Sequence, residues 1–310
     1  MPVMAPSKSS AGGETQIAAA YNNVGHRYSK YADGSTRDLF LFDGRHAYGD
    51  AKTWETIKSK LLTLHAKDPR RLRVLDLGCG PGTWLRRVVA YAHRIGFTEI
   101  IANGFDIADG QLNHARALSH RLASLDGVRI IFSHGDLRGD FGANEHDLCL
   151  CLYGVLNHIP RDELPLVMDR IALCSSGYFL ATVRTIGSTP TVYVDDVCSA
   201  VRFYQDNQND RLDVEFSDGQ RTSFRSHLFS RDELKCLAAA SFAIEDIRGL
   251  DLFHGRFAND PRWNPPEHQT TSRVSRELSQ LEERYCRDSG FIDRAAHLLL
   301  VARNKGLRQT

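Results

Sequence analysis

The sequence predicts an α/β fold, in which helices cover both faces of a largely parallel sheet. From residue 72 to residue 184, short apolar runs typical of buried strands alternate with stretches of helical length and helical periodicity. Such alternation is typical of parallel sheets, because each crossover between parallel strands is usually a helix. A glycine-rich turn at 78–82 joins the first of these strands to the next helix, as in α/β proteins that bind nucleotides.

The elements are expected in this order along the chain. A helix at 51–66 comes before the alternation. The strands of the alternation are predicted at 72–78, 99–107, 128–136, 147–154 and 177–184, and its helices at 83–95, 109–124 and 160–174. After Arg184 the sequence predicts a hairpin at 211–226 around the Asp218-Gly219 turn, a helix at 230–240, a strand at 242–253, a surface helix at 271–285 and a strand at 296–304.

The chain is expected to form one main domain with additions. Residues 1–14 are polar and glycine-containing and are predicted to be a disordered tail, and residues 15–70 are predicted to be helices that cap the domain. The main domain is predicted to span 71–310, with insertions at about 186–227 and about 254–290 that interrupt the strand–helix alternation.

Composition restricts the class of protein. Hydrophobic residues make up 42% and charged residues 25% of the 310 residues, and the formal net charge is +1, which argues against an electrostatic nucleic-acid footprint. The seven cysteines form no CxxC pair and show no metal-ligand spacing, so we expect reduced cysteines and no metal site. No signal-peptide pattern opens the chain and the longest apolar run, 148–156, is too short for a membrane span. We therefore expect a cytoplasmic protein without a membrane partner.

The glycine turn has the spacing Gly78-x-Gly80-x-Gly82. A strand, a glycine turn and a helix place bare backbone N–H groups at a helix N-terminus, which suits a polar or anionic ligand. The dinucleotide fingerprint requires Gly or Ala where this chain has Thr83. That departure, together with Asp76 inside the motif, disfavours a nicotinamide oxidoreductase.

The octet "LDLGCGPG", residues 75–82, closely resembles the first motif of class I S-adenosylmethionine (SAM) dependent methyltransferases. The resemblance covers about residues 70–185, with weaker agreement at 228–305. It implies SAM as the cofactor and a Rossmann-like, seven-stranded mixed sheet whose final strand is antiparallel.

The resemblance also implies roles for residues at the ends of the strands. Asp106, followed by Ile107, accepts hydrogen bonds from both ribose hydroxyls, as an acceptor-only carboxylate can. Asp136 accepts from the adenine amino group, and the backbone of Leu137 lies at the ring edge. The methionine half of SAM is expected along the following residues: Asp76, Gly78, Gly80, Gly82, Leu152 and Tyr153.

Candidate catalytic residues lie in "LYGVLNHIP", 152–160, and in the first insertion. His158 is the candidate general base because its reference pKa is near neutrality. Asn157 is a candidate to orient the substrate or the SAM amino group. Tyr193 is a candidate for the pocket wall, because inserted segments above the carboxyl edge of the sheet usually fix substrate choice.

The N-terminal segment is a candidate lid. Tyr21, Tyr28 and Tyr31 are expected to contact the sulfonium by cation–π interaction or to exclude water from the site. Arginines of the same region are candidates for the SAM carboxylate, and the sequence does not choose among them: Arg27, Arg37 and Arg45.

The sequence therefore favours a methyltransferase that acts on N or O of a small molecule. The Asn/Asp-Pro-Pro-aromatic tetrad that resembles nucleobase amino-methylating enzymes is absent from the sequence, which disfavours a DNA adenine substrate. Because the charge is also balanced, no nucleic-acid partner is expected. Two alternatives stay open. One is an enzyme of the same fold that cyclises SAM itself to azetidine-2-carboxylate and methylthioadenosine, and the other is a non-catalytic SAM-binding protein. The sequence leaves the methyl acceptor and the oligomeric state open.

Overall fold

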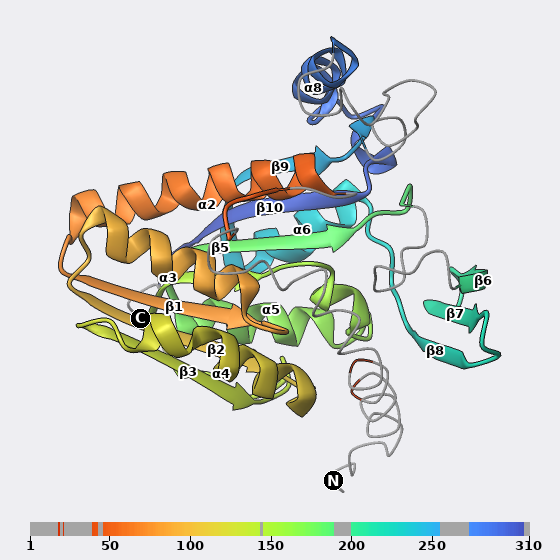
Figure 1. The fold of residues 1–310 in the computed structure, drawn as a ribbon. Helices are drawn as coiled ribbons and strands as arrows, with labels where there is room; N and C mark the ends of the chain where they lie inside the picture. The colour runs from red at the N-terminus through yellow and green to blue at the C-terminus, as the bar shows by residue number, and fades with distance from the viewer. Residues whose placement is uncertain are drawn as a thin grey trace, which may run out of the picture.

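The computed structural model describes residues 18, 21, 39–42, 46–142, 145–188, 200–254 and 273–306. Their centre is a seven-stranded sheet with the strand order β3-β2-β1-β4-β5-β10-β9 (Figure 1). The first five strands in this order are parallel to one another, and β10 runs antiparallel to both β5 and β9. The predicted fold class, a Rossmann-like mixed sheet with a late antiparallel strand, is confirmed.

The strands have these bounds: β1 (Arg71–Leu77), β2 (Glu99–Asp106), β3 (Val128–His134), β4 (His146–Cys151), β5 (Ser175–Arg184), β9 (Phe242–Leu250) and β10 (His297–Asn304). The helices are α2 (Ala47–Lys67), α3 (Thr83–Ile95), α4 (Asp109–Ala123), α5 (Leu164–Cys174), α6 (Arg231–Ser241) and α8 (Arg273–Tyr285), with short 3-10 turns η1 (Val155–His158) and η3 (Ile292–Arg294). Each agrees with a predicted element to within a few residues, except η1 and η3, which the sequence did not predict.

The core lies in two layers because side chains alternate along the strands. On β4, Leu148 and Leu150 pack against the side that carries α2, α3 and α4. Cys149 and Cys151 point to the opposite side, where they pack with α5 and α6. Burial on both faces explains why the strand sequences are continuously apolar rather than alternating.

The helix after β4 begins later than the sequence indicates. The sequence predicts a helix over 160–174, whereas α5 begins at Leu164 and Pro165 occupies its first turn. Proline fits that position because the first helical N–H has no intrahelical acceptor. Pro165 therefore starts the helix and does not disturb it.

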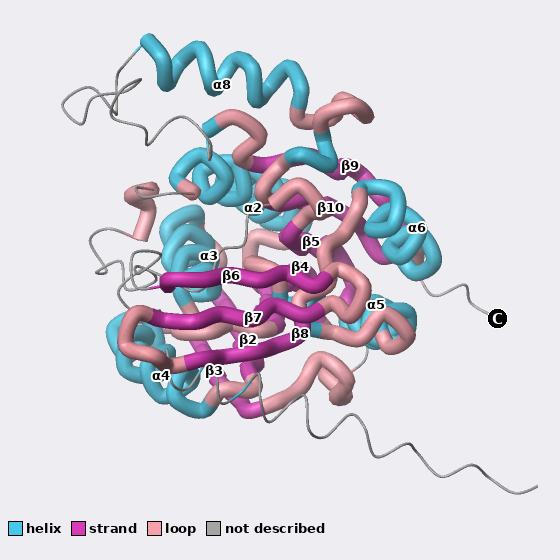
Figure 2. Tube along the Cα trace, turned by 90° about the vertical axis from the view of Figure 1, so that its right-hand side faces the viewer, coloured by secondary structure: helices cyan, strands magenta, loops and turns pink. Residues whose placement is uncertain are grey.

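A second, three-stranded antiparallel sheet stands at the carboxyl ends of β1, β4 and β5. It consists of β6 (Ala200–Asp206), β7 (Arg211–Phe216) and β8 (Arg221–Arg225), in that order. Figure 1 shows the arrowheads of β1 and β5 pointing toward this sheet, and Figure 2 shows it lying across the end of the larger one. The hairpin of β7 and β8 is confirmed. Strand β6 was not predicted, because its charged and exposed residues obscure the alternation of a half-buried strand.

The described residues contain no helix long and apolar enough to cross a membrane. The tail at 1–14 and most of the cap segment at 15–70 that precedes α2 lie outside the described residues. The expected domain boundaries stay predictions, as does the cytoplasmic location.

Candidate functional site

A cavity of about 450 Å³ lies where the parallel strands end. Its inner wall is formed by the turns that follow β1, β2, β3 and β4, and its outer wall by residues at the ends of β7 and β8. Ligands bind at this edge in open α/β sheets. The structure brings these predicted site residues together in the cavity wall: Tyr21, Gly78, Gly80, Asp106, Ile107, Asp136, Leu137, Leu152, Tyr153 and His158.

A smaller cavity of about 50 Å³ adjoins the same turn. Gly78, Leu152 and Tyr153 line both cavities, so the two share one wall. The smaller cavity adds Asp76 and Arg87, of which the sequence predicted only Asp76. Arg87 belongs to α3, and its helical position gave no sequence signal that it lines the site.

Two glycines of the glycine turn allow neighbouring groups to lie close to the backbone. Gly78 has φ +69°, and a Cβ there would come within 2.4 Å of Val155. Gly82 has φ +73° and lines neither cavity, and a Cβ there would lie 2.9 Å from the Phe132 ring. Gly82 therefore permits α3 to pack closely on β3, while Gly78 leaves bare backbone in the cavity wall.

Asp106 is fixed by the backbone around it. One carboxylate oxygen accepts from the Gly80 N–H at 2.8 Å, and the other accepts from the Ala108 N–H at 2.9 Å. Burial raises the pKa of Asp106 above its usual value, and these N–H groups partly offset that rise. Each carboxylate oxygen keeps a second lone pair, so the group can accept two further hydroxyl donors in the cavity.

Asp76 is buried, with 2% of its surface exposed. Its Oδ2 atom has no hydrogen-bond partner among the described residues. Burial, together with the nearby charge of Asp106, raises the pKa of Asp76 to about 8, against the effect of the Leu85 N–H. A buried carboxyl oxygen that accepts no hydrogen bond from the described residues, beside a cavity, fits a ligand that carries an ammonium group.

Asp136 is held by an arginine that the sequence analysis missed. The Arg138 guanidinium contacts both carboxylate oxygens, at 2.6 and 2.8 Å, and also donates to Glu163 at 3.1 Å. Burial raises the pKa of Asp136, but the hydrogen bonds and charge of Arg138 outweigh it, so the pKa lies below its usual value. Arg138 thus fixes an ionised acceptor in the cavity wall. The spacing Asp-x-Arg in "GDLRG" was the available signal.

The contacts of His158 define its tautomer. Its Nδ1 lies 2.7 Å from the carbonyl oxygen of Arg225, and a carbonyl only accepts, so Nδ1 carries the proton. Nε2 is then the lone-pair atom and accepts from the Tyr21 hydroxyl at 2.9 Å. Burial lowers the pKa of His158 to about 4. At neutral pH the ring is uncharged, and its basic nitrogen lies at the contact with the N-terminal segment.

Asn157 does not line the cavity. Its side-chain NH₂ donates to the carbonyl oxygens of Arg184 and His227, and its Oδ1 accepts from the Arg184 N–H at 3.0 Å. With 1% of its surface exposed, Asn157 connects the turn after β4 to the end of β5 and to the segment before α6. The predicted contact of Asn157 with substrate has no support in this placement, because the amide is used by the protein backbone.

Several predicted residues lie outside the described part of the chain, so their contacts stay predictions: Tyr28, Tyr31, Tyr193, Arg27, Arg37 and Arg45. Conversely, the outer wall contains Arg211, Phe224 and Arg225, which the sequence analysis did not select. Residues of the hairpin were recognised as strand, but their placement over the cavity depends on long-range packing.

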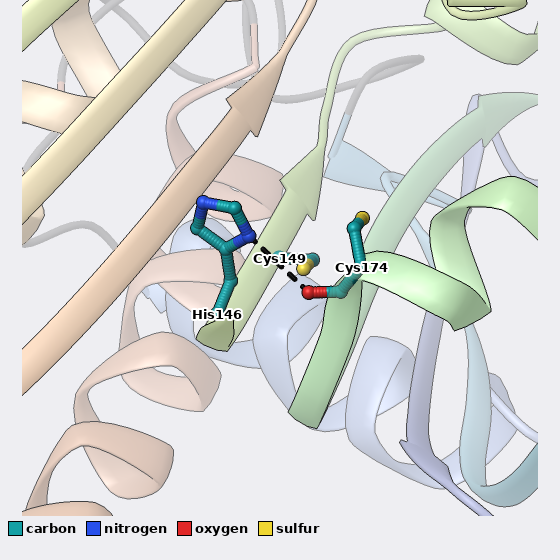
Figure 3. A group of neighbouring side chains, drawn as sticks. All are labelled: His146, Cys149 and Cys174. Atoms are coloured by element: carbon teal, nitrogen blue, oxygen red, sulfur yellow. Dashed lines mark hydrogen bonds between the residues drawn. The ribbon is translucent and has the colours of Figure 1, made fainter. Parts of the chain in front are cut away.

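The structure also gathers groups that lie apart in the sequence. His146, Cys149 and Cys174 offer ligand atoms within 4.8 Å of one another at the amino end of β4, opposite the cavity (Figure 3). Hydrogen bonding from Cys149 holds the pKa of the Cys174 thiol below its usual value, while burial raises that of Cys149. A second such group is formed by His46, Asp251 and His297. Their donors come from separate segments, so sequence spacing gave no sign of either group.

Comparison with known proteins identifies the kind of domain that carries this cavity. A family model described as a methyltransferase domain matches residues 74–175, from β1 to the start of β5. No curated protein matches the sequence. Residues 74–175 therefore match a methyltransferase domain, and the sheet order and glycine turn around them are those of the class I SAM-dependent methyltransferase fold.

Solved structures support the fold. The [4+2]-cyclase SpnF is 16% identical, with 98% of this chain and 99% of that chain covered and a TM-score of 0.53. Magnesium protoporphyrin IX methyltransferase (ChlM) from Synechocystis PCC 6803, with bound SAH, is 14% identical over 94% and 99% at a TM-score of 0.51. The CcbJ methyltransferase from Streptomyces caelestis is 16% identical over 80% and 94% at 0.50. At these identities the likeness concerns the fold.

Proposed function

We propose that this enzyme transfers the methyl group of SAM to a nitrogen or oxygen atom of a small molecule held beneath the β6–β8 sheet. One observation carries the proposal. A single cavity is lined on one side by residues of the cofactor-binding pattern and on the other by Arg211, Phe224 and Arg225 from the three-stranded sheet. An acceptor between these walls lies beside the cofactor and is shielded from water.

The residues of the inner wall fit SAM. Asp106 would accept from the ribose hydroxyls, and the ionised Asp136 with Leu137 would receive the adenine edge. Asp76, whose Oδ2 has no partner among the described residues, would receive the ammonium group, and Arg87 in the smaller cavity suits the carboxylate. SAM supplies an electrophilic methyl group, and the wall formed by Leu152 and Tyr153 lies between the two cavities where its sulfonium would fit.

His158 is the proposed base on the acceptor side. Its ring is neutral above about pH 4, and Nε2 is the nitrogen that can take a proton. In the structure that atom holds the Tyr21 hydroxyl, so an acceptor with an O–H or N–H group would replace Tyr21 as the donor. Asn157 acts as a positioning residue in this proposal, because it fixes the turn that carries His158.

The proposal is tested by product analysis. The purified protein is incubated with SAM alone and then with SAM and a panel of small amines, phenols and carboxylates, and products are resolved by mass spectrometry. S-adenosylhomocysteine that forms only with an acceptor supports methyl transfer. Methylthioadenosine from SAM alone would overturn it in favour of cyclisation, and tight SAM binding without either product would indicate a binding protein. The variant Asp106→Ala serves as the control for background turnover.

A further inference from the structure

We propose that His46, Asp251 and His297 form a binding site for one divalent transition-metal ion, with Zn²⁺ as the best match. The site is separate from the residues assigned to SAM and does not depend on the proposed methyl transfer. It connects the start of α2 to the end of β9 and the start of β10.

The three residues come from distant segments and meet at one edge of the sheet. His46 precedes α2, Asp251 follows β9 and His297 begins β10, and one donor atom from each lies within 4.8 Å of the other two. Nδ1 of His46 is 3.3 Å from Oδ2 of Asp251. That separation is long for a charge-assisted hydrogen bond. Two ligands bound to zinc at about 2.0–2.1 Å with tetrahedral angles lie about 3.3 Å apart, which matches it.

The backbone of Gly49 fixes the orientation of the Asp251 carboxylate. The backbone N–H of Gly49 donates to Oδ1 of Asp251 at 3.1 Å, so Oδ2 is the oxygen turned toward His46. A Cβ at residue 49 would come within 2.5 Å of Oδ2, so glycine permits this approach. Asp251 itself has φ +59°, a conformation that costs a non-glycine residue of the order of 1 kcal/mol. Metal ligands are commonly fixed by such outer contacts.

The ligand types favour a first-row transition metal. Two imidazoles with one carboxylate match the three protein ligands of open zinc sites, and hard cations such as Mg²⁺ prefer oxygen donors. The cluster is well shielded, because Asp251 and His297 are 3% and 8% exposed. The His297 ring lies 6.1 Å from that of Tyr153, which lines both cavities. A bound ion would therefore stiffen the wall between the two cavities.

The second cluster is the poorer candidate. In it, Nδ1 of His146 lies 3.2 Å from the Cys174 carbonyl oxygen (Figure 3). Its Nε2 lies 3.2 Å from the Asn103 amide nitrogen. Both ring nitrogens are thus hydrogen-bonded within the protein, and binding an ion through Nδ1 would break the bond to the carbonyl. In the His46 cluster, the contact between Nδ1 of His46 and Oδ2 of Asp251 joins two of the proposed ligands, so an ion would replace it with bonds to both.

The test uses the full chain, stripped with a chelator and titrated with Zn²⁺ alone in an isothermal calorimeter. We expect one ion per chain, and a rise in Tm on adding Zn²⁺, since an ion that binds only the folded state stabilises it. His46→Ala and Asp251→Asn should each weaken binding by at least about 100-fold and remove the Tm rise. Cys149→Ser, in the other cluster, and His120→Ala, an exposed histidine, are the controls and should bind as the wild type does.

A spectroscopic measurement keeps the proposal testable if one variant folds poorly. Co²⁺ in the wild-type chain should give visible bands of a nitrogen–oxygen site without the ultraviolet thiolate charge-transfer band. A thiolate band, Zn²⁺ binding that Cys149→Ser abolishes, binding that both His46→Ala and Asp251→Asn retain, or no stoichiometric binding would overturn the proposal.

Discussion

Binding of SAM near neutral pH should release a proton from Asp76. The pKa of this buried carboxyl group is raised to about 8 in the cofactor-free protein. At pH 7 a group with that pKa is about 90% protonated, and ionising it costs about 1.4 kcal/mol. An ammonium group placed against the carboxylate favours the charged form and lowers the pKa again. The expected release is therefore about 0.9 proton per SAM bound at pH 7.

The release is measured by calorimetric titration of SAM in two buffers of different ionisation enthalpy, such as phosphate and Tris. The observed binding enthalpies should differ by about 0.9 of the difference between the buffers' ionisation enthalpies. Asp76→Asn should abolish this dependence. Equal enthalpies in both buffers for the wild type would refute the assignment of Asp76 as a protonated group that receives the ammonium.

Asp76 also predicts how stability depends on pH. Its folded-state pKa lies above the unfolded value of about 3.9, so its contribution is fully present below about pH 4 and is lost as the pH rises through about 8. In the cofactor-free protein, Asp76→Asn should therefore raise the free energy of unfolding relative to wild type at pH 8 more than at pH 5. Urea denaturation at both pH values checks this, and an equal effect at both would contradict it.

Three further outcomes are expected. Asp106→Ala should weaken SAM binding, measured by calorimetry, by more than about 1.5 kcal/mol, or roughly tenfold, whereas Asp109→Ala, at an exposed position, should leave it unchanged. Equal SAM affinities of the wild type and Asp106→Ala would show that Asp106 does not bind the ribose. His158→Gln should lower kcat by about 100-fold or more. The wild-type rate should fall only as the pH approaches 4, where the His158 ring becomes charged. A fall in rate centred near pH 6.5 would contradict the lowered pKa of His158. Asn157→Ala should cost roughly 2–4 kcal/mol of stability in urea denaturation, because it leaves buried backbone groups without partners, and an unchanged midpoint would refute that role.

The residues of the inner wall of the cavity could be predicted from the sequence because each belongs to a local sequence pattern. The octet at 75–82 begins within β1, Asp106 ends β2 and Asp136 comes two residues after β3, and parallel strands end at a common edge. The sheet of the predicted fold followed for the same reason, since strand and helix periodicities differ clearly within each segment. Arg138 was missed although it stands two residues from Asp136, because an arginine after a strand is ordinarily a surface residue.

The residues of the outer wall could not be predicted because their placement depends on packing between segments that are distant in the sequence. The sequence identified β7 and β8 as a hairpin, but not that Phe224 and Arg225 face the cavity. Asn157 was expected to touch substrate because it is polar at the end of a strand. In the structure its amide satisfies backbone groups 27 and 70 residues away, which no local pattern reports.

The separateness of the three-stranded sheet has a consequence for how such an enzyme diversifies. Strands β6–β8 pair with one another and contribute no strand to the sheet whose turns form the inner wall. Under the proposed function, selection on residues 200–225 would therefore change acceptor choice while the glycine turn and Asp106 stay as they are. A chimera with a foreign hairpin in place of 211–225 would test this, because it should accept different molecules while SAM binding stays unchanged.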